Sequence, residues 1–432
     1  MRILYLSFFF PPYNSIGAVR SGKLTKYLHR LGHDVRVVSG RDQPAPSTLP
    51  LELPPERIEY TAWLDFRRLA GGKGYQPAKP GADGPRAAPR SFLKVKALLW
   101  QAFKTIFYFP DMQVGWFGPA LRAARRLARE WQPDVIYASA MPYTSLLVAR
   151  RLSRELGVPW VGELRDLWAD HQAYPYPAWR RWIESRMEKS VLSSARALVT
   201  VSQPLAEKLR AKYACPVHVI TNGFDAEDYA GEPCANTGSG PLRIVYTGTV
   251  YKGKQDPGPL FEAVRQLGPD ASRIRIEFYG RLNELLPVGE QAARMGVAER
   301  VEIKGPVPFT EVTRLQREAD VLLMLIWTDL RERGVFTGKL FEYLGARRPI
   351  LAVGPSQDVA AQLILGRQAG AVLKDPARIA AQLSDWLAQK NSAQGLPPLP
   401  AAVGAGYTRA SQAAQLADCL TALIGATKPC AE

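Results

Sequence analysis

The stretch RGVFTGKLFEYLGARRPILAVGP, at residues 333–355, combines a loop, a short helix and a strand. Thr337 and Gly338 mark the start of the helix, because a Thr side chain caps exposed amides and Gly lets a ligand approach the backbone. Leu340 and the apolar residues that follow it at helical spacing are expected to form the buried face. The stretch therefore predicts a helix whose N-terminus is open to a ligand.

Lys339 and Glu342 lie three residues apart on a neighbouring face of this helix. That spacing puts a cation near the positive end of the helix and a carboxylate one turn deeper. A phosphate followed by a sugar hydroxyl fits this arrangement. The candidate donor-binding residues here are Thr337, Gly338, Lys339, Leu340 and Glu342. An amphipathic helix whose Lys and Glu are merely solvated accounts for the spacing equally well.

The segment KLFEYLGARRPILA, ahead of a Gly-Pro turn, resembles the donor-binding helix of family-4 glycosyltransferases. These are two-domain enzymes of the GT-B type that transfer sugars from nucleotide diphosphates. The family commonly has two glutamates separated by seven residues, and the resemblance implies that Glu342 is the second, which binds the ribose hydroxyls. The first position, near the donor sugar, is Gly334 in this chain, and Glu332 two residues away does not match it.

Length and composition set limits on the class of protein. A chain of 432 residues predicts two or three domains, and 47% hydrophobic residues are enough for real cores. Lys and Arg number 56 against 40 Asp and Glu, which gives a net charge of +16. This excess favours an anionic partner, which could be nucleic acid, an acidic membrane or a phosphorylated substrate.

Cysteine spacing and hydropathy indicate a cytosolic protein. The four cysteines show no CxxC pair and no His cluster, so we expect reduced thiols and no metal site. No apolar run reaches the ~18 residues expected of a membrane-spanning helix. The opening MRILYLSFFF is expected to be a buried strand rather than a signal peptide, because two prolines end it and no cleavage site follows.

The first strand is predicted at residues 3–9, and the loop FPPYNSIGAVR leads into a helix. Gly17 lies where this loop meets the helix N-terminus, a usual place for ligands in an open parallel sheet. The GxGxxG pattern of nicotinamide-binding proteins is absent. His33, in the following turn, is expected to be structural. The loop, helix and GHDVRVV turn together resemble the acceptor-side start of the same glycosyltransferase family.

Residues 43–110 are expected to form a mobile insertion with basic and aromatic residues. The part up to about residue 90 is rich in Pro, Gly and Ala and shows neither helical nor strand periodicity. Residues 92–110 then mix Leu and aromatic side chains with lysines. Such a helix can lie among the headgroups of an acidic membrane, or it can be a core helix with snorkelling lysines.

The predicted strand VPWVGELRDLW ends in a group of polar residues. Because working residues of doubly wound sheets lie at such strand ends, Glu163, Arg165, Asp166 and His171 are candidates. Many members of the resembling family have a His beside the reacting sugar, and the resemblance places Asp166 there. A buried Asp–Arg pair with a structural role is the alternative.

The second half restarts the strand–loop–helix pattern at Leu242, followed by the loop GTVYKGKQDPG. Gly248 allows close approach to the backbone, while Lys252 and Lys254 supply charge, so a diphosphate is a sensible ligand. The family usually has an arginine directly after the strand glycine. This chain has Thr there, so the resemblance assigns the cationic role to these lysines and to Arg281.

Two further features follow from the resemblance. The turn that ends at Pro308 would lie against the nucleotide base, and the last helix would return to the first domain. The predicted domains are residues 1–222 on the acceptor side, a linker at 223–240, a nucleotide-sugar-binding domain at 241–403, and a returning segment at 404–432. The run from Val321 is predicted to be a buried parallel strand, because it is too short to span a membrane.

These patterns together predict an α/β protein of the GT-B fold, with two doubly wound Rossmann-like domains facing across a cleft. The expected reaction moves a sugar from a nucleotide-diphosphate sugar to a glycan or polyprenyl-linked acceptor, with no metal or other cofactor. The resemblance implies retention at the anomeric carbon. We expect a cytoplasmic protein at the inner face of the cell membrane that binds no nucleic acid. The alternatives are a nucleotide-sugar epimerase on the same fold, or an inactive relative that binds membranes or nucleic acid.

Overall fold

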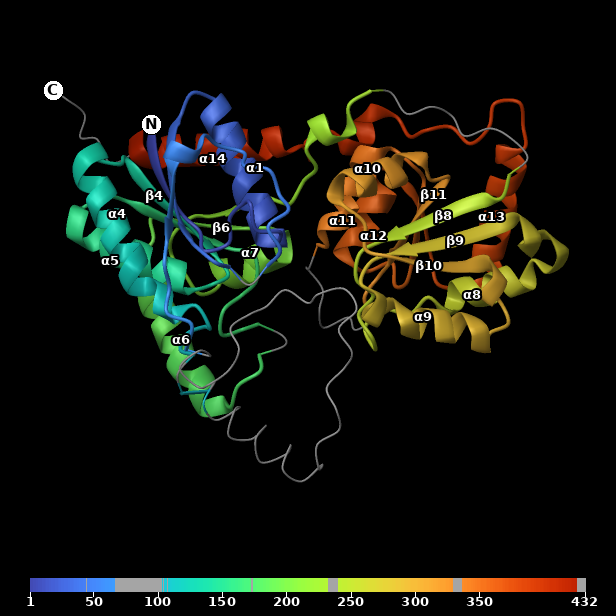
Figure 1. Ribbon diagram of the computed structural model, residues 1–432, viewed down its shortest axis with the longest axis horizontal. Helices are drawn as coiled ribbons and strands as arrows, with labels where there is room; N and C mark the ends of the chain where they lie inside the picture. Colours follow the sequence, from blue (N-terminus) through green and yellow to red (C-terminus); the bar gives the residue numbers. More distant parts are fainter. Residues whose placement is uncertain are drawn as a thin grey trace. The chain divides into compact units, whose positions relative to one another are not determined.

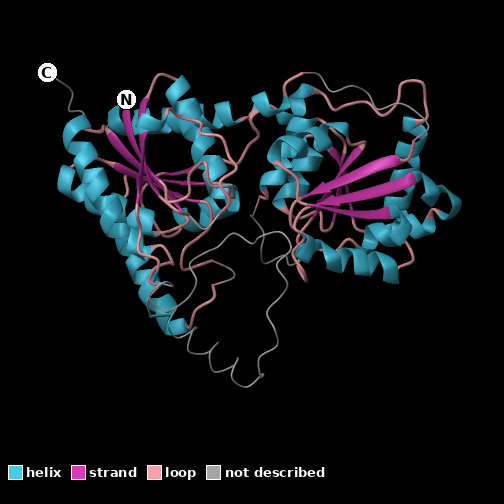
Figure 2. Ribbon diagram, viewed as in Figure 1, coloured by secondary structure: helices cyan, strands magenta, loops and turns pink. Residues whose placement is uncertain are grey.

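The computed structural model describes residues 1–43, 45–66, 103, 105–106, 108–171, 174–231, 240–328 and 336–425 (Figure 1). The chain forms two compact units, one of Met1–Thr221 with Ala410–Glu432 and one of Asn222–Arg409. Each unit contains a parallel sheet covered by helices (Figure 2). The predicted α/β class with two doubly wound sheets is therefore confirmed.

The sheet of the first unit has the strand order β3-β2-β1-β4-β5-β6-β7, and all its pairings are parallel. The order reverses beside β1, so the strand ends of β1 and β4 flank the switch point where ligands bind in such sheets. The strands are β1 Arg2–Leu6, β2 Asp34–Gly40, β3 Ile58–Thr61, β4 Val135–Ala140, β5 Trp160–Leu164, β6 Ala197–Thr200 and β7 Val217–Val219.

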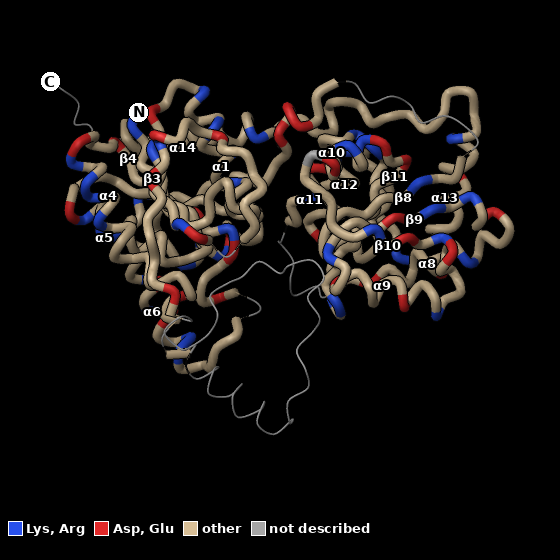
Figure 3. The backbone as a smooth tube through the Cα atoms, viewed as in Figure 1, with Lys and Arg blue, Asp and Glu red and all other residues tan. Residues whose placement is uncertain are grey.

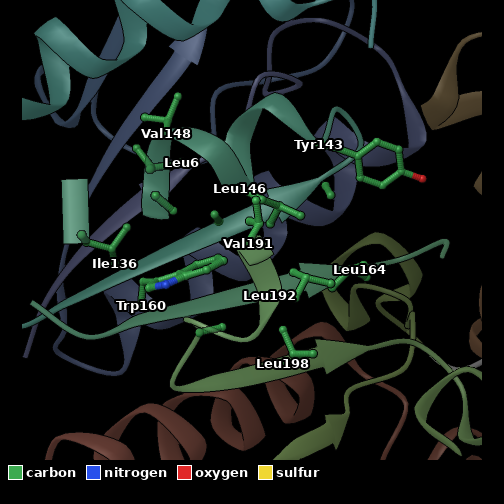
Figure 4. Packing of buried hydrophobic residues seen from close by; sticks show 14 of the residues in the cluster. Leu6, Ile136, Tyr143, Leu146, Val148, Trp160, Leu164, Val191, Leu192 and Leu198 are labelled. Carbon is green, nitrogen blue, oxygen red and sulfur yellow. The ribbon is translucent and has the colours of Figure 1, made fainter. Parts of the chain in front are cut away.

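Both faces of this sheet are buried, because successive residues of β1 point to opposite sides. Leu4 and Leu6 join the core beneath α4–α7, whereas Ile3 and Tyr5 join the core beneath α1 and α14. Figure 4 shows residues of α5 and α6 packed against the strands in the first of these cores. The helices are α1 Ile16–Arg30, α4 Phe117–Trp131, α5 Thr144–Leu156, α6 Ala178–Leu192, α7 Gln203–Arg210 and α14 Arg409–Gly425.

The C-terminal helix α14 packs on the sheet of the first unit. Ala413, Leu416 and Leu420 are fully buried in the same core as Ile3 and Leu24. The burial of this apolar stripe holds the end of the chain against the sheet that begins it.

The predicted loop at residues 43–90 is wrong for one short segment. Residues Ile58–Thr61 form β3, which pairs with β2 at the edge of the sheet. Ile58 and Thr61 are buried, while the two residues between them are only partly so. Four residues are too few for periodicity to stand out from a Pro-rich surrounding sequence. The rest of the insertion from residue 67 to 102 lies outside the described residues.

The sheet of the second unit has the order β10-β9-β8-β11-β12-β13, again with parallel pairings. Its strands are β8 Leu242–Thr247, β9 Ile274–Tyr279, β10 Val301–Gly305, β11 Val321–Leu325, β12 Ile350–Val353 and β13 Gly370–Leu373. Its helices are α8 Gly258–Gln266, α9 Leu282–Arg294, α10 Phe309–Glu318, α11 Gly338–Ala346, α12 Val359–Gly366 and α13 Pro376–Lys390. All five residues of β11 are buried, which confirms the predicted buried strand.

Residues 223–231, in the segment predicted as a linker, are folded within the second unit. The Phe224 N–H donates to the Tyr407 carbonyl at 3.0 Å. A Cβ added at Gly345 of α11 would lie 2.7 Å from the Phe224 ring and 3.0 Å from the Tyr229 ring. Close packing against a bare helix face therefore attaches this segment to α11.

Charged residues of both signs lie along the helices of the two units (Figure 3). Among the described residues, no helix combines the length and the apolar character needed to cross a membrane. Within the same residues, Cys215 and Cys419 are free thiols.

Candidate functional site

Three glycines end neighbouring strands at the carboxyl edge of the second sheet. The Gly248 N–H donates to the Tyr279 carbonyl at 2.7 Å, and the Gly280 N–H donates to the Gly305 carbonyl at 3.0 Å. A Cβ on Gly280 would lie 2.2 Å from the Gly248 carbonyl oxygen, so no other residue fits there. Gly248 has a φ of +114°, which side chains rarely tolerate. The strand ends thus present an edge of bare backbone.

Helix α11 begins beside this edge without the predicted side-chain cap. Thr337 occupies the N-cap position, but its side chain makes no capping hydrogen bond. Its hydroxyl instead contacts the Met324 sulfur at 3.8 Å, because the side chain turns toward β11. A Cβ added at Gly338 would meet no described atom within 4 Å. The first amides of α11 are therefore free of a side-chain cap and have open space beside them.

Lys339 points its amine at the glycine edge. Its Nζ is inaccessible to solvent and forms no hydrogen bond with any described residue. The amine lies 3.8 Å from the centre of the Tyr246 ring, and a Cβ on Gly248 would be 3.3 Å from it. Burial lowers the pKa of Lys339 to about 7, although the Glu342 carboxylate acts in the opposite direction. The site therefore contains a buried amine that lacks a hydrogen-bond partner among the described residues.

Glu342 lies one turn further along α11 and is connected to the end of β8. The Gln316 amide donates to Glu342 Oε2 at 3.2 Å and to Thr247 Oγ1 at 3.0 Å. The Tyr229 hydroxyl donates to Gln316 Oε1 at 2.7 Å and so fixes the orientation of the amide. Burial raises the pKa of Glu342, and Gln316 partly offsets this effect. The carboxylate is thus held in place by a buried hydrogen-bond chain.

The two loop lysines occupy different surroundings. The Lys254 amine lies 4.5 Å from the centre of the Trp327 ring, and the Lys254 carbonyl accepts from the Thr328 N–H at 2.9 Å. These contacts attach the loop after β8 to the loop after β11. Lys252 is exposed and lines a cavity of about 430 Å³ between its loop and α9.

Arg281 and Pro308 follow the other two strand-end glycines. Arg281 is the N-cap residue of α9; its side chain is 78% exposed and lies 3.8 Å from Glu284. Pro308 is the exposed N-cap residue of α10. Both residues lie at the carboxyl edge of the sheet, at the starts of α9 and α10. Gly334, at the position where the resembling family has its first glutamate, lies outside the described residues.

In the first unit the structure brings Gly17 and Arg165 together. A Cβ on Gly17 would lie 2.5 Å from Arg165 Nη1, so the guanidinium rests on the N-terminus of α1. Arg165 Nε donates to the Ala140 carbonyl at 2.7 Å, and Nη2 donates to the Met141 carbonyl at 3.1 Å. Arg165 therefore joins the ends of β4 and β5 to the start of α1.

Asp166 follows this arginine and is partly buried, but it forms no hydrogen bond or ion pair within the described part of the chain. His171 lies further along the same loop, where its N–H donates to the Trp168 carbonyl at 3.3 Å. Asp166 is thus the candidate whose carboxylate remains open to a substrate in the first unit.

Glu163, another candidate from the sequence, has a structural role. Its carboxylate is fully buried, accepts from Arg20 Nε at 2.8 Å, and accepts from the Ser139 hydroxyl at 2.5 Å. Arg20 also donates to the Thr221 carbonyl at 2.7 Å and to the Ile220 carbonyl at 2.8 Å. Burial acts to raise the pKa of Glu163, but the charges of Arg20 and Arg165 and the hydrogen bonds from Ser139 and Arg20 together lower it. The predicted working residue is therefore one half of a buried ion pair.

Sequence reasoning missed the residues that support Lys339 and Glu342. Tyr246 belongs to the buried strand β8, and Gln316 belongs to α10, so each looks like an ordinary core or helix residue. Gln316 is completely buried, but a polar residue within an amphipathic helix is normally expected to be exposed, so the sequence does not indicate this burial. Only the fold brings these residues to the strand edge.

The chain is similar to known proteins in both sequence and fold. Residues 18–228 match Glycosyltransferase Family 4. Sucrose-phosphate synthase from Thermosynechococcus elongatus has a similar fold, with a TM-score of 0.60, 14% identity, and coverage of 99% of this chain and 100% of that one. HepE of Anabaena, solved in complex with UDP, has a TM-score of 0.61 and 14% identity, and the match covers 98% of this chain and 100% of that one.

A putative UDP-N-acetylglucosamine 2-epimerase from Listeria monocytogenes gives a TM-score of 0.53 at 12% identity, with coverage of 99% of this chain and 97% of that one. No curated protein matches the chain in sequence. At such low identities the solved structures establish the fold alone.

The buried Arg20–Glu163 pair yields a prediction about stability. Glu163→Gln leaves the Arg20 guanidinium buried without its counter-ion, so we expect the free energy of unfolding to fall by about 3 kcal/mol in urea titrations. Glu155→Gln, which removes an exposed carboxylate that binds Arg125 and Arg151, is the matched control and should leave the unfolding midpoint nearly unchanged. Equal midpoints for both variants would contradict the structural role of Glu163.

Proposed function

We propose that this chain is a glycosyltransferase that moves a sugar from a nucleoside-diphosphate sugar to a glycan or lipid-linked acceptor. The match of residues 18–228 to Glycosyltransferase Family 4 and the GT-B fold support this proposal. The observation that carries the proposal is the buried, unpartnered amine of Lys339 beside the Gly248 edge. A diphosphate would supply the anionic partner that this amine lacks.

The donor would bind along the carboxyl edge of the second sheet. The diphosphate would accept hydrogen bonds from the uncapped amides of α11 and from Lys339, with Lys254 and Lys252 nearby on the loop after β8. Glu342, held by Gln316, would accept from a ribose hydroxyl one turn deeper. The turn before Pro308 would lie against the base. Each group would thus meet one part of the donor.

Charge that develops on the leaving diphosphate would be stabilised by these amides and amines, which are already in place before the reaction. We propose that transfer needs no metal for this purpose and retains the configuration at the anomeric carbon. Asp166, whose carboxylate has no partner in the described chain, would lie on the acceptor side together with Gly17 and His171. Nucleic acid has no role in this reaction.

The acceptor and the cellular location follow from the same proposal. A glycan or polyprenyl-linked acceptor would be met at the inner face of the cell membrane, where the excess of 16 positive charges favours an acidic surface. Residues 92–110, which the sequence predicts to lie among lipid headgroups, fall largely outside the described residues.

A thermal-shift screen with nucleoside diphosphates tests the proposed function. The HepE neighbour was solved with UDP, so UDP is the first ligand, with GDP and ADP as comparisons. A ligand at about 100 times its Kd stabilises the folded state by about 2.7 kcal/mol, and the melting temperature should rise accordingly. No shift with any of the three would contradict the proposal. Epimerisation of a UDP-sugar without an acceptor would instead support the epimerase alternative.

Removal of the Lys339 amine should weaken donor binding strongly. Lys339→Met keeps the apolar stem but removes the charge, so we expect the donor KM to rise about 10- to 100-fold and kcat to fall with it. Steady-state kinetics with a UDP-sugar measure both quantities. Arg265→Gln removes an exposed cation of α8 that binds Glu262, and it serves as the control with unchanged kinetics. Wild-type kinetics in Lys339→Met would exclude this residue from the diphosphate site.

A further inference from the structure

Helix α6 buries three charged residues, Arg180, Glu184 and Glu188, and exposes both of its tryptophans, while Val191 and Leu192 near its end join the core. Arg180, Glu184 and Glu188 are at most 2% exposed, whereas Trp179 is 53% and Trp182 is 59% exposed. Large aromatic side chains are normally covered in a folded protein, so this arrangement marks a surface that meets something other than water.

Hydrogen bonds on the buried side fix the orientation of the helix. Arg180 Nε donates to Glu184 Oε1 at 2.7 Å. Glu188 accepts from the Tyr213 hydroxyl at 2.8 Å and from the Ala169 N–H at 2.9 Å. Each buried charge thus has a partner, and rotation of the helix to bury its tryptophans would break these bonds. The apolar side is therefore held outward.

The outward side, which we call the Trp face, consists of Trp179, Trp182, Ile183, Arg186 and Lys189. Ile183 is 39% exposed, and the Arg186 guanidinium lies 3.8 Å from the centre of the Trp182 ring. The exposed side chain of Lys189 forms no hydrogen bond or ion pair with the described residues. Large apolar groups and unpaired cations therefore occupy the same side of the helix.

The charges of α6 are separated by sign. Both carboxylates of the helix, Glu184 and Glu188, are buried, so its exposed charges are all positive. Of these, Arg181 lies 3.7 Å from Asp170, while Arg186 and Lys189 contact no carboxylate in the described chain. A second copy of the same face would bring like charges together, which disfavours a symmetric dimer here. The Trp face is complementary to an anionic surface.

A further exposed apolar residue, Ile106, lies in a segment that is attached to α6 through Arg180. Arg180 Nη1 donates to the Thr105 carbonyl at 2.9 Å, and Nη2 donates to the Pro110 carbonyl at 3.3 Å and to the Tyr108 carbonyl. These bonds hold the segment around Ile106 near the N-terminal end of the helix. Ile106 is itself 64% exposed.

We propose that the Trp face docks on a lipid bilayer that contains anionic headgroups. Trp179 and Trp182 would lie at headgroup level, where the amphipathic indole ring is favoured, and Ile183 would reach the acyl boundary. Arg186 and Lys189 would contact lipid phosphates. The inference does not depend on sugar transfer, and it places docking on α6 rather than on residues 92–110.

Flotation with lipid vesicles tests this surface. The wild-type chain should bind vesicles of phosphatidylcholine with about one-third phosphatidylglycerol and bind pure phosphatidylcholine far more weakly. The double variant Trp179→Ser with Trp182→Ser should lose at least about tenfold in partitioning. Arg186→Gln with Lys189→Gln should lose about fivefold per removed cation at low salt, and the loss should shrink in high salt.

Matched controls remove similar groups elsewhere. Leu365→Ser changes an apolar residue of α12 that is 45% exposed, and Arg122→Gln with Arg129→Gln removes two exposed cations of α4. Both controls should float like the wild type. Circular dichroism and the thermal shift with UDP, measured on each variant, separate loss of docking from loss of folding or of donor binding.

Three results would overturn the proposal. The first is a wild-type chain that does not bind anionic vesicles. The second is a Trp179→Ser, Trp182→Ser variant that is folded and floats as well as the wild type, because docking would then belong to another segment. The third is a wild-type dimer in sedimentation that the same variant converts to a monomer, because a second copy would then cover the Trp face.

Discussion

The candidate site depends on one unsatisfied group, the buried amine of Lys339. It lies against the Tyr246 ring and beside Gly248, and it has no hydrogen-bond acceptor among the described residues. Such a group destabilises the empty protein unless it loses its proton, which is why its pKa falls to about 7. The bare strand ends and the uncapped start of α11 leave room for an anion beside it. A diphosphate would relieve this burial penalty by supplying the anionic partner.

The first unit uses its buried charges differently. Arg20 and Glu163 satisfy each other, and Arg20 also binds backbone carbonyls at the end of the sheet. Arg165 also binds backbone carbonyls at a strand end, and its guanidinium covers the start of α1. These residues fix the strand ends, so that Asp166 is left as the open carboxylate at this edge. The family match covers mainly this unit, while the geometry that points to a nucleotide lies in the second.

The sequence predicts the features that depend on local periodicity and on strand ends. It does not predict the contacts of side chains whose partners lie far away in the chain. The two sheets, the buried side of α11 and the closeness of Lys339 to the loop of Gly248 follow from hydrophobic spacing and from the rule that parallel strands end at one edge. Thr337 looks like a cap, but it turns toward Met324. In α6, the i, i+3 spacing of Trp179 and Trp182 would indicate a buried side, yet buried ion pairs turn them outward. Partners of this kind, far apart in the chain, cannot be read from spacing.

The central claim is that a diphosphate restores the charge of Lys339, and proton uptake measures this directly. Titration calorimetry of UDP binding at pH 8, in two buffers with different enthalpies of ionisation, gives the number of protons bound with each ligand. Most of the free Lys339 would be neutral at this pH, and the bound diphosphate would raise its pKa again. The account predicts an uptake of about one proton by the wild type and close to none by Lys339→Met. UDP binding without proton uptake by the wild type would contradict it.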